Sequence, residues 1–262
     1  MFFDHPSNPD PSDMLGDSSD EDASGGRAES ELAFFAERFG GTAPLFPLGN
    51  LTLLPHVVQP FHMFEPRYRQ LAEDAVGGDG FIALGVLDPT GTASYESKST
   101  KIFPHVCLGK IMQYEPLPEG RWNLIVRGLW RAEVTDEVSD GLVGSKLYRQ
   151  VELDVRDETF EVDLPPAQVT VRREALIGLF TRVQPKLAAN PVIKAMLDRE
   201  MPLGLLTDFV AHALDLSPTA GASLLREVDP LKRCQFLEAM LAAHLKATSH
   251  DDRPFPPEFS VN

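Results

Sequence analysis

The stretch from Pro44 to Leu71, PLFPLGNLTLLPHVVQPFHMFEPRYRQL, constrains the fold most because its apolar spacing changes period. Residues 45–61 are rich in Leu, Val and Phe but are interrupted by three prolines. Proline removes a donor from a strand ladder, so this part predicts short edge or bulged strands. From Pro66 to Gly77 the apolar positions follow helical spacing, at Tyr68, Leu71, Ala72, Ala75 and Val76. We therefore expect two strands that lead into a helix.

The same stretch resembles the start of the substrate-binding amino-terminal domain of Lon proteases. The runs LFPL, LLP and PFHMFEPRYRQL match that family's pattern, and CLGKIMQYEPLPEGRWNLIVRGLWRAEV resembles its strand hairpin, with Glu119 where Asp is common. The resemblance extends into the carboxyl-terminal half, roughly over residues 44–247. Its structural signature consists of Phe46, Pro47, His62, Phe64, Glu65, Pro66, Arg67, Tyr68, Arg69, Gly109 and Gly128. The fold that it implies is α+β, a PUA-like β pseudo-barrel followed by a small helical bundle.

Residue patterns in the first half predict further strands. Residues 80–87 form a short apolar run between turn signals, and residues 106–114 and 144–155 are expected as strands. Gly128 is expected at a bulge. In residues 129–134 the alternation predicts that Trp130 points inward and Arg131 outward.

Three helix-start signals identify the second half as helical. Asn190, Ser217 and Asp229 are good capping residues, and each is followed directly by proline. Apolar spacing predicts a buried face for each helix. For the helix after Pro202, this face is Leu205, Phe209, Ala213 and Leu214.

These patterns divide the chain into five segments. Residues 1–31 hold nine acidic residues and one arginine, and residues 1–28 are expected to be a disordered acidic tail. The other expected segments are a short amphipathic helix at 29–41, a β subdomain at 42–160, a helical subdomain at 161–247 and a tail at 248–262.

Charge and composition exclude several classes of function. The net charge is −15, which disfavours binding to nucleic acid. No apolar run approaches the about 20 residues that span a bilayer, and no secretory signal is visible, so we expect a cytoplasmic protein without membrane association. The two cysteines, Cys107 and Cys234, cannot form a disulfide framework or a four-cysteine zinc site.

Patterns for catalysis, metal binding or cofactor binding are also missing. Gly141 to Lys146 has the wrong spacing for a phosphate loop, and Ser97–Lys98 lies in a polar segment that would not lower a lysine pKa. His62 is expected to be a core histidine with one hydrogen-bonded nitrogen. Glu65 is expected to cap the following helix, and Arg67 to reach a carboxylate or a strand carbonyl. No catalytic residue, metal ligand or cofactor is predicted.

The family resemblance implies a non-catalytic module, either polypeptide-binding or adaptor, that stands alone without ATPase and protease modules. Its expected partners are unfolded or tagged polypeptides, with an ATPase or protease as a further candidate. Phe34, Phe35 and Trp122 are the candidate binding residues. The two alternatives are an ATP-independent hydrolase (a peptidase with an unrecognised site) and an RNA-binding PUA-like protein. The acidic charge opposes the RNA-binding alternative.

Overall fold

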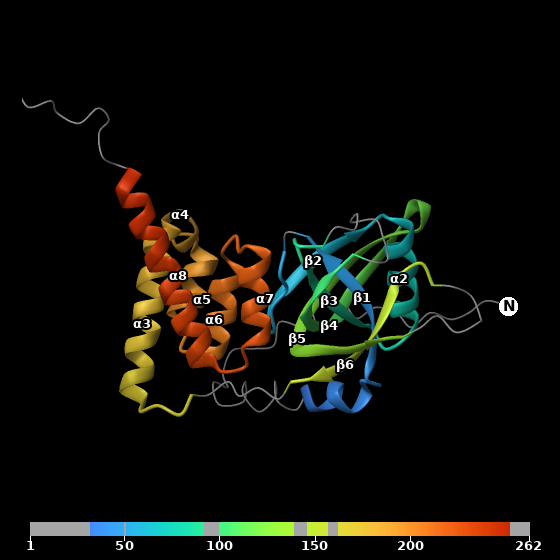
Figure 1. The fold of residues 1–262 in the computed structure, drawn as a ribbon, viewed down its shortest axis with the longest axis horizontal. Helices are drawn as coiled ribbons and strands as arrows, with labels where there is room; N and C mark the ends of the chain where they lie inside the picture. The colour runs from blue at the N-terminus through green and yellow to red at the C-terminus, as the bar shows by residue number, and fades with distance from the viewer. Residues whose placement is uncertain (1–31, 50, 92–99, 139–145, 157–161, 252–262) are drawn as a thin grey trace, which may run out of the picture. The chain divides into compact units, whose positions relative to one another are not determined.

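One mixed sheet of six strands dominates the first half of the chain (Figure 1). The computed structural model describes residues 32–49, 51–91, 100–138, 146–156 and 162–251. It divides into two compact units, Met1–Phe39 and Gly40–Asn262, and the described part of the first unit contains a helix over residues 32–38. The strands of the second unit are β1 Thr42–Leu48, β2 Val58–Met63, β3 Phe81–Leu87, β4 Ile102–Leu117, β5 Arg121–Glu137 and β6 Arg149–Val155.

The strands close into a ring. Their order is β2-β5-β4-β3-β1-β6, and a further pairing between β5 and β6 completes the ring, with β2 attached to the first half of β5. β1 runs parallel to β3, and the other pairs are antiparallel. β2 is the edge strand of the described sheet, as its proline predicts.

The edge-strand prediction is wrong for β1, which has a neighbour on each side. β6 pairs with Thr42–Leu45 and β3 pairs with Leu45–Leu48, so each partner covers only part of the strand. Pro44 therefore lies where only β6 is paired, and Pro47 lies where only β3 is paired. Each proline thus has a side on which no ladder donor is required.

The helix predicted after residues 62–67 is α2, Pro66–Gly77, and it buries Tyr68, Leu71, Ala72 and Ala75. The expected side-chain cap by Glu65 is wrong. Its backbone carbonyl accepts from the N–H groups of Tyr68 and Arg69 at 2.9 and 2.8 Å, but its carboxylate accepts from Arg67 Nε at 3.1 Å. A guanidinium forms a stronger, charge-assisted bond than a backbone N–H, which explains why the carboxylate turns to Arg67.

The predicted helical region begins with α3. The described helices of this region are α3 Pro166–Val183, α4 Pro185–Ala188, α5 Pro191–Asp198, α6 Leu203–His212, α7 Pro218–Arg226 and α8 Pro230–Asp251. All three predicted helix starts are confirmed, because the side chains of Asn190, Ser217 and Asp229 accept bonds from N–H groups in the first turns of α5, α7 and α8. α8 continues to Asp251, so the segment expected as a tail from residue 248 begins as helix. None of the described helices combines the length and apolarity needed to cross a membrane.

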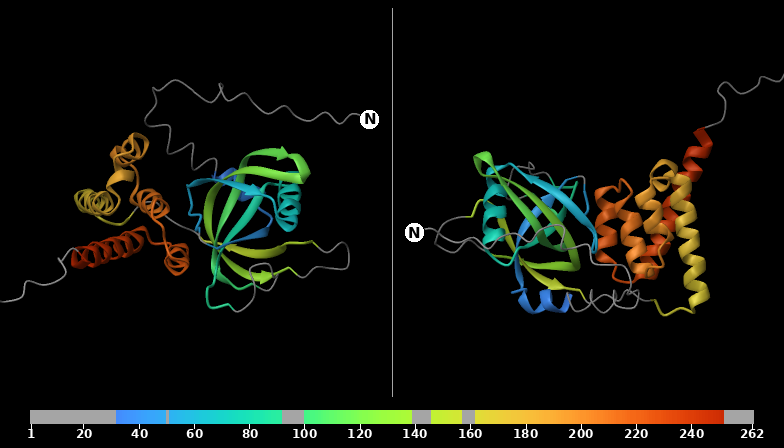
Figure 2. Two further views of the ribbon diagram at one scale, coloured as in Figure 1. Left: turned by 90° about the horizontal axis from the view of Figure 1, so that it is seen from above. Right: turned by 180° about the vertical axis from the view of Figure 1, so that it is seen from behind.

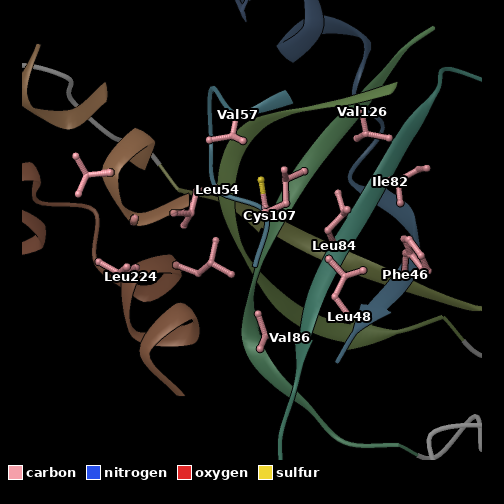
Figure 3. Packing of buried hydrophobic residues seen from close by; sticks show 14 of the residues in the cluster. Phe46, Leu48, Leu54, Val57, Ile82, Leu84, Val86, Cys107, Val126 and Leu224 are labelled. Carbon is pink, nitrogen blue, oxygen red and sulfur yellow. The ribbon is translucent and has the colours of Figure 1, made fainter. Parts of the chain in front are cut away.

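A single hydrophobic core joins the sheet to the helices, and the α+β class is confirmed. The core cluster includes Leu84 and Cys107 on strands and Leu224 on α7, and Figure 3 shows this continuity from Phe46 to Leu224. At the junction, a Cβ on Gly221 of α7 would lie 1.9 Å from Thr52 Oγ1. The missing side chain of Gly221 therefore allows α7 to approach the segment between β1 and β2 closely.

Candidate functional site

The β4–β5 hairpin extends beyond the core. Residues 106–109 of β4 are all buried, whereas residues 112–116 of the same strand are all exposed. Consecutive strand residues point to opposite faces, so uniform exposure means that neither face is packed. The strands are joined by a 3-10 turn, Pro118–Gly120, in which Glu119 and Gly120 adopt positive φ angles of 64° and 71°.

Bulky apolar side chains gather on this hairpin and the adjoining end of β2. Phe64 is 60% exposed, Tyr114 54% and Met112 42%, and the partly buried Trp122 lies edge-on to Tyr114 with 6.0 Å between ring centroids. The register places Tyr114 and Trp122 on one face of the hairpin, because Trp122 pairs with Pro116 and Tyr114 with Leu124. Phe64 follows β2 and stacks on His62 on the opposite face. We call Met112, Tyr114 and Trp122 the hairpin surface.

A row of polar side chains crosses β2, β5 and β4 on the face opposite to Tyr114 and Trp122. His62 Nδ1 lies 2.8 Å from Asn123 Oδ1, and Asn123 Nδ2 donates to Glu115 Oε2 at 2.9 Å. His62 also stacks on Phe64, with 6.0 Å between ring centroids. The expectation of a core histidine is wrong, because Val58, Pro60 and His62 lie on the exposed side of β2. This row contains no hydroxyl or thiol that could act as a nucleophile.

The first turn of α2 supports the tip of the hairpin. Arg69 Nη1 donates to the backbone carbonyl of Glu119, and Figures 1 and 2 show the turn of the hairpin beside α2. Arg67 contacts the carboxylate of Glu65 at 2.9 Å, which confirms the expectation that it reaches a carboxylate at this corner. The signature residues Arg67 and Arg69 therefore hold the corner and the hairpin in position.

The other candidate binding residues, Phe34 and Phe35, lie on the helix of residues 32–38. Phe34 is 53% exposed and Phe35 9% exposed, and their ring centroids are 5.8 Å apart. The guanidinium of Arg38 lies 5.2 Å from the Phe34 ring centroid. This helix belongs to the unit Met1–Phe39 and Trp122 to the unit Gly40–Asn262, so the hairpin surface is defined without the two phenylalanines.

Two signature glycines permit close packing beneath this region. A Cβ on Gly109 would lie 2.7 Å from Leu84 Cδ1. A Cβ on Gly128 would lie 2.2 Å from the carbonyl oxygen of Leu54. The predicted bulge is present next to Gly128, because the β4–β5 register shifts between Leu108 and Gly109, whose partners are Trp130 and Gly128.

Two other signature residues pack against each other in the core. The Phe46 ring lies edge-on to Tyr68 with 4.6 Å between ring centroids.

The sequence reasoning missed a buried ion cluster between the sheet and the helices. Arg131 of β5 is fully buried and donates from Nη1 and Nη2 to the two oxygens of Asp208 on α6, at 3.1 and 2.5 Å. Arg131 Nε also donates to the Leu224 carbonyl at 3.0 Å. Arg233 of α8, likewise buried, places its Nε 3.6 Å from Asp208 Oδ1.

Two predictions fail at this cluster. Arg131 points into the interior, not outward, because helices cover the face of β5 that the alternation assigned to solvent. The buried side of α6 includes Leu206, Asp208 and Val210, whereas Leu205 and Phe209 are only partly buried. An aspartate inside the apolar run LLTDFV was the available signal, because a charge is buried only when it is paired.

His56, beside this cluster, gives folding a pH dependence. Burial, with Arg127, Arg131 and Arg233 adding to it and Asp208 opposing it, lowers the pKa of His56 from 6.5 to about 4. Between these values the unfolded chain binds a proton that the folded chain excludes, so stability falls as the pH drops from 6.5 to 4. We expect a loss of about 2 to 3 kcal/mol in the free energy of unfolding across this range.

The test is His56→Asn, with the free energy of unfolding measured by urea titration at several pH values. Asn tolerates the positive φ of 66° at this position and does not titrate. The variant should lose stability less steeply than the wild type between pH 6.5 and 4. A shallower slope should remain, because burial also lowers the pKa of His105 and His212. Equal slopes for the two proteins would show that His56 is not the group responsible.

Both cysteines are buried. Burial and the Glu238 carboxylate raise the pKa of Cys234 to about 12, and Cys107 is fully buried. Within the described ranges, no group of three or more His, Cys, Asp or Glu side chains is arranged to hold a metal ion. Ser97–Lys98 and residues 141–145 lie outside those ranges, as do residues 1–31 and 252–262.

Comparison with known proteins gives one consistent result. Residues 42–243 match the model of the ATP-dependent protease La (LON) substrate-binding domain. The Lon protease of Desulfatibacillum aliphaticivorans is 23% identical over 217 residues, which cover 81% of this chain and 25% of that protein. The Lon protease of Trichlorobacter lovleyi is 24% identical over 220 residues, covering 82% and 25%. The chain spans about a quarter of the length of these curated relatives.

Solved structures share the fold. The N-terminal domain of the Mycobacterium avium complex Lon protease aligns with a TM-score of 0.59 at 19% identity, covering 78% of this chain and 99% of that one. A Lon N-terminal domain protein from Xanthomonas campestris aligns with a TM-score of 0.51 at 22% identity, covering 77% and 97%.

Proposed function

This chain belongs to the family of substrate-binding domains of ATP-dependent protease La (Lon), and from that premise we propose that it is a polypeptide-binding module. The observation that carries the proposal is the hairpin surface, where the exposed side chains of Met112 and Tyr114 on β4 lie beside Trp122 of β5. Exposed apolar groups gathered in one place are typical of binding sites, whereas single ones are ordinary.

An unfolded polypeptide suits this surface for two physical reasons. Its apolar side chains are exposed, so they gain burial against Tyr114 and Met112 without any cost of opening a folded core. Tyr and Trp side chains also supply large contact areas at a low cost in conformational entropy. α2 holds the tip of the hairpin and the core of the ring holds its base, so this surface is already ordered before binding.

The proposed module binds without catalysis and acts as a recognition or adaptor component. The hydrogen-bonded row of His62, Asn123 and Glu115 contains no hydroxyl or thiol that could act as a nucleophile. Cys234 stays protonated at neutral pH, because its pKa is raised to about 12. In the adaptor form of the proposal, polypeptides bound at the hairpin surface pass to an ATPase or protease partner.

The test measures the affinity for a chemically unfolded, fluorescently labelled model protein. In the variant Met112→Ser/Tyr114→Ser, two exposed side chains of the hairpin surface lose most of their apolar area, and we expect affinity to fall about tenfold or more. Val192→Ser on α5 is the matched control because Val192 is 68% exposed and lies outside the hairpin surface. It should bind like the wild type.

Other results would contradict the proposal. Equal affinity of the double variant and the control would exclude the hairpin surface as the binding site. Cleavage of the labelled protein, abolished by a substitution at a serine or histidine, would indicate a hydrolase. Salt-sensitive retention of RNA would indicate the PUA-like RNA-binding alternative.

A further inference from the structure

Positive charge concentrates around the hairpin surface of an otherwise acidic chain. Residues 58–69 and 110–127 contain five arginine or lysine residues and three glutamates, a local net charge of +2 in a chain of −15. Two of these five residues lie on the first turn of α2: Arg67, which has the carboxylate of Glu65 as its partner, and Arg69.

Arg69 is partnered differently from Arg67. Its Nη1 donates to the Glu119 carbonyl, and no carboxylate of the described residues lies within 4.0 Å of its guanidinium. Its Nε is buried without a hydrogen-bond acceptor within those residues. A partly desolvated guanidinium with only a neutral acceptor retains most of its capacity to bind a carboxylate.

Arg69 also lies next to the apolar groups. It contacts the turn that joins the exposed part of β4 to Trp122, and Nη1 is 3.7 Å from the position that a Cβ of Gly120 would occupy. Because Gly120 has no side chain, the hairpin does not cover the guanidinium at that point. An extended peptide that crosses Tyr114 and Trp122 would therefore pass a positive charge within a few residues.

We propose that Arg69 is a specificity residue of the hairpin surface, which takes extended polypeptide segments that pair a bulky apolar side chain with a nearby Asp or Glu side chain. This inference rests on the proposed function, because it specifies which polypeptides the surface prefers. Charge complementarity supplies the preference, and burial of the apolar side chain supplies most of the affinity. The overall charge of −15 repels acidic peptides at long range, so the preference is a short-range effect at one arginine.

The test uses two fluorescein-labelled peptides that are identical except that one contains Phe-Leu-Glu where the other contains Phe-Leu-Gln. Each peptide is made in two forms, one with a free and one with an amidated carboxyl terminus. The wild type should bind the Glu peptide about 3- to 10-fold more tightly than the Gln peptide, whatever its terminus. Arg69→Gln should bind both peptides with the wild-type affinity for the Gln peptide, and Arg69→Lys should retain part of the preference. Arg172→Gln on α3 removes the same charge elsewhere and should keep the full preference.

The outcomes separate the two proposals. If the wild type binds neither peptide nor the unfolded model protein, the proposed function fails. If it binds both peptides equally, the proposed function stands and the role of Arg69 is wrong. The role of Arg69 is also wrong if the preference follows the free carboxyl terminus, or if it persists in Arg69→Gln. A thermal melt of Arg69→Gln establishes that this variant is folded in the binding assay. If it is unfolded, Arg69→Lys, which keeps a donor for the Glu119 carbonyl, is the variant in which the preference for Glu over Gln is measured.

Discussion

Asp208→Asn should lower the free energy of unfolding by about 3 to 5 kcal/mol, because it leaves buried arginines without their carboxylate partner. Asp208 accepts both guanidinium bonds of Arg131, and Arg233 lies 3.6 Å from the same carboxylate. In the variant, two positive charges remain in the interior and have lost the Asp208 carboxylate that offsets their desolvation. Small domains are stable by only about 5 to 15 kcal/mol, so the variant should melt at a much lower temperature.

Urea and thermal unfolding provide the measurement, and Arg172→Gln provides the comparison. Arg172 of α3 bonds Glu238 of α8 at 2.8 Å, but its side chain is 41% exposed. Water already screens that pair, so its loss should cost about 1 kcal/mol or less. If Asp208→Asn costs no more than Arg172→Gln, the buried cluster does not hold the helices to the sheet.

Gly128→Ala should destabilise the protein by about 3 kcal/mol or more, at the upper end of penalties for overpacking. The new Cβ would lie 2.2 Å from the Leu54 carbonyl oxygen and 2.9 Å from Cys107 Sγ. The Leu54–Val57 segment cannot withdraw easily, because His56 N–H donates to the Gly128 carbonyl at 2.8 Å and Gly128 N–H donates to the Val57 carbonyl at 2.9 Å. Relief of the clash would therefore break backbone hydrogen bonds.

Gly178→Ala is the matched control for this substitution. Gly178 lies inside α3, and a Cβ there would meet no atom within 4 Å. Alanine restricts the unfolded chain and favours the helix, so this variant should be equally stable or up to about 1 kcal/mol more stable. A similar loss in both variants would show that the approach of Leu54 to Gly128 is not the cause.

The candidate site was only partly predictable. Trp122 was chosen from the sequence and lies at the hairpin surface, but Tyr114 and Met112 were read only as members of a strand. Both faces of β4 are exposed at residues 112–116 because the hairpin extends beyond the core. Strand periodicity predicts which residues share a face, but it does not predict how far a strand extends beyond the core. Arg69 was identified as a signature residue, but its contact with the Glu119 carbonyl could not be predicted, because the two residues are 50 positions apart in the sequence.

Local physics determined the parts that the sequence predicted by itself. Proline and the capping residues Asn190, Ser217 and Asp229 act within a single turn, so the helix starts could be located without knowledge of the fold. The change of apolar period after Pro66 located α2, and the helix starts located the helical second half. The α+β class was implied by the family resemblance. The family resemblance, carried by LFPL and FEPRYR, added the likeness to Lon amino-terminal domains.

Tertiary structure alone decided which charges are buried. Alternation along β5 assigned Arg131 to solvent, because that pattern assumes that one face of the strand is wet. Helices cover that face, and the cost of burying Arg131 is offset by Asp208, which is 77 residues away in the chain. The ring of strands, the cluster that joins it to the helices and the projection of the hairpin depend on such long-range contacts, and no window of the sequence contains both partners.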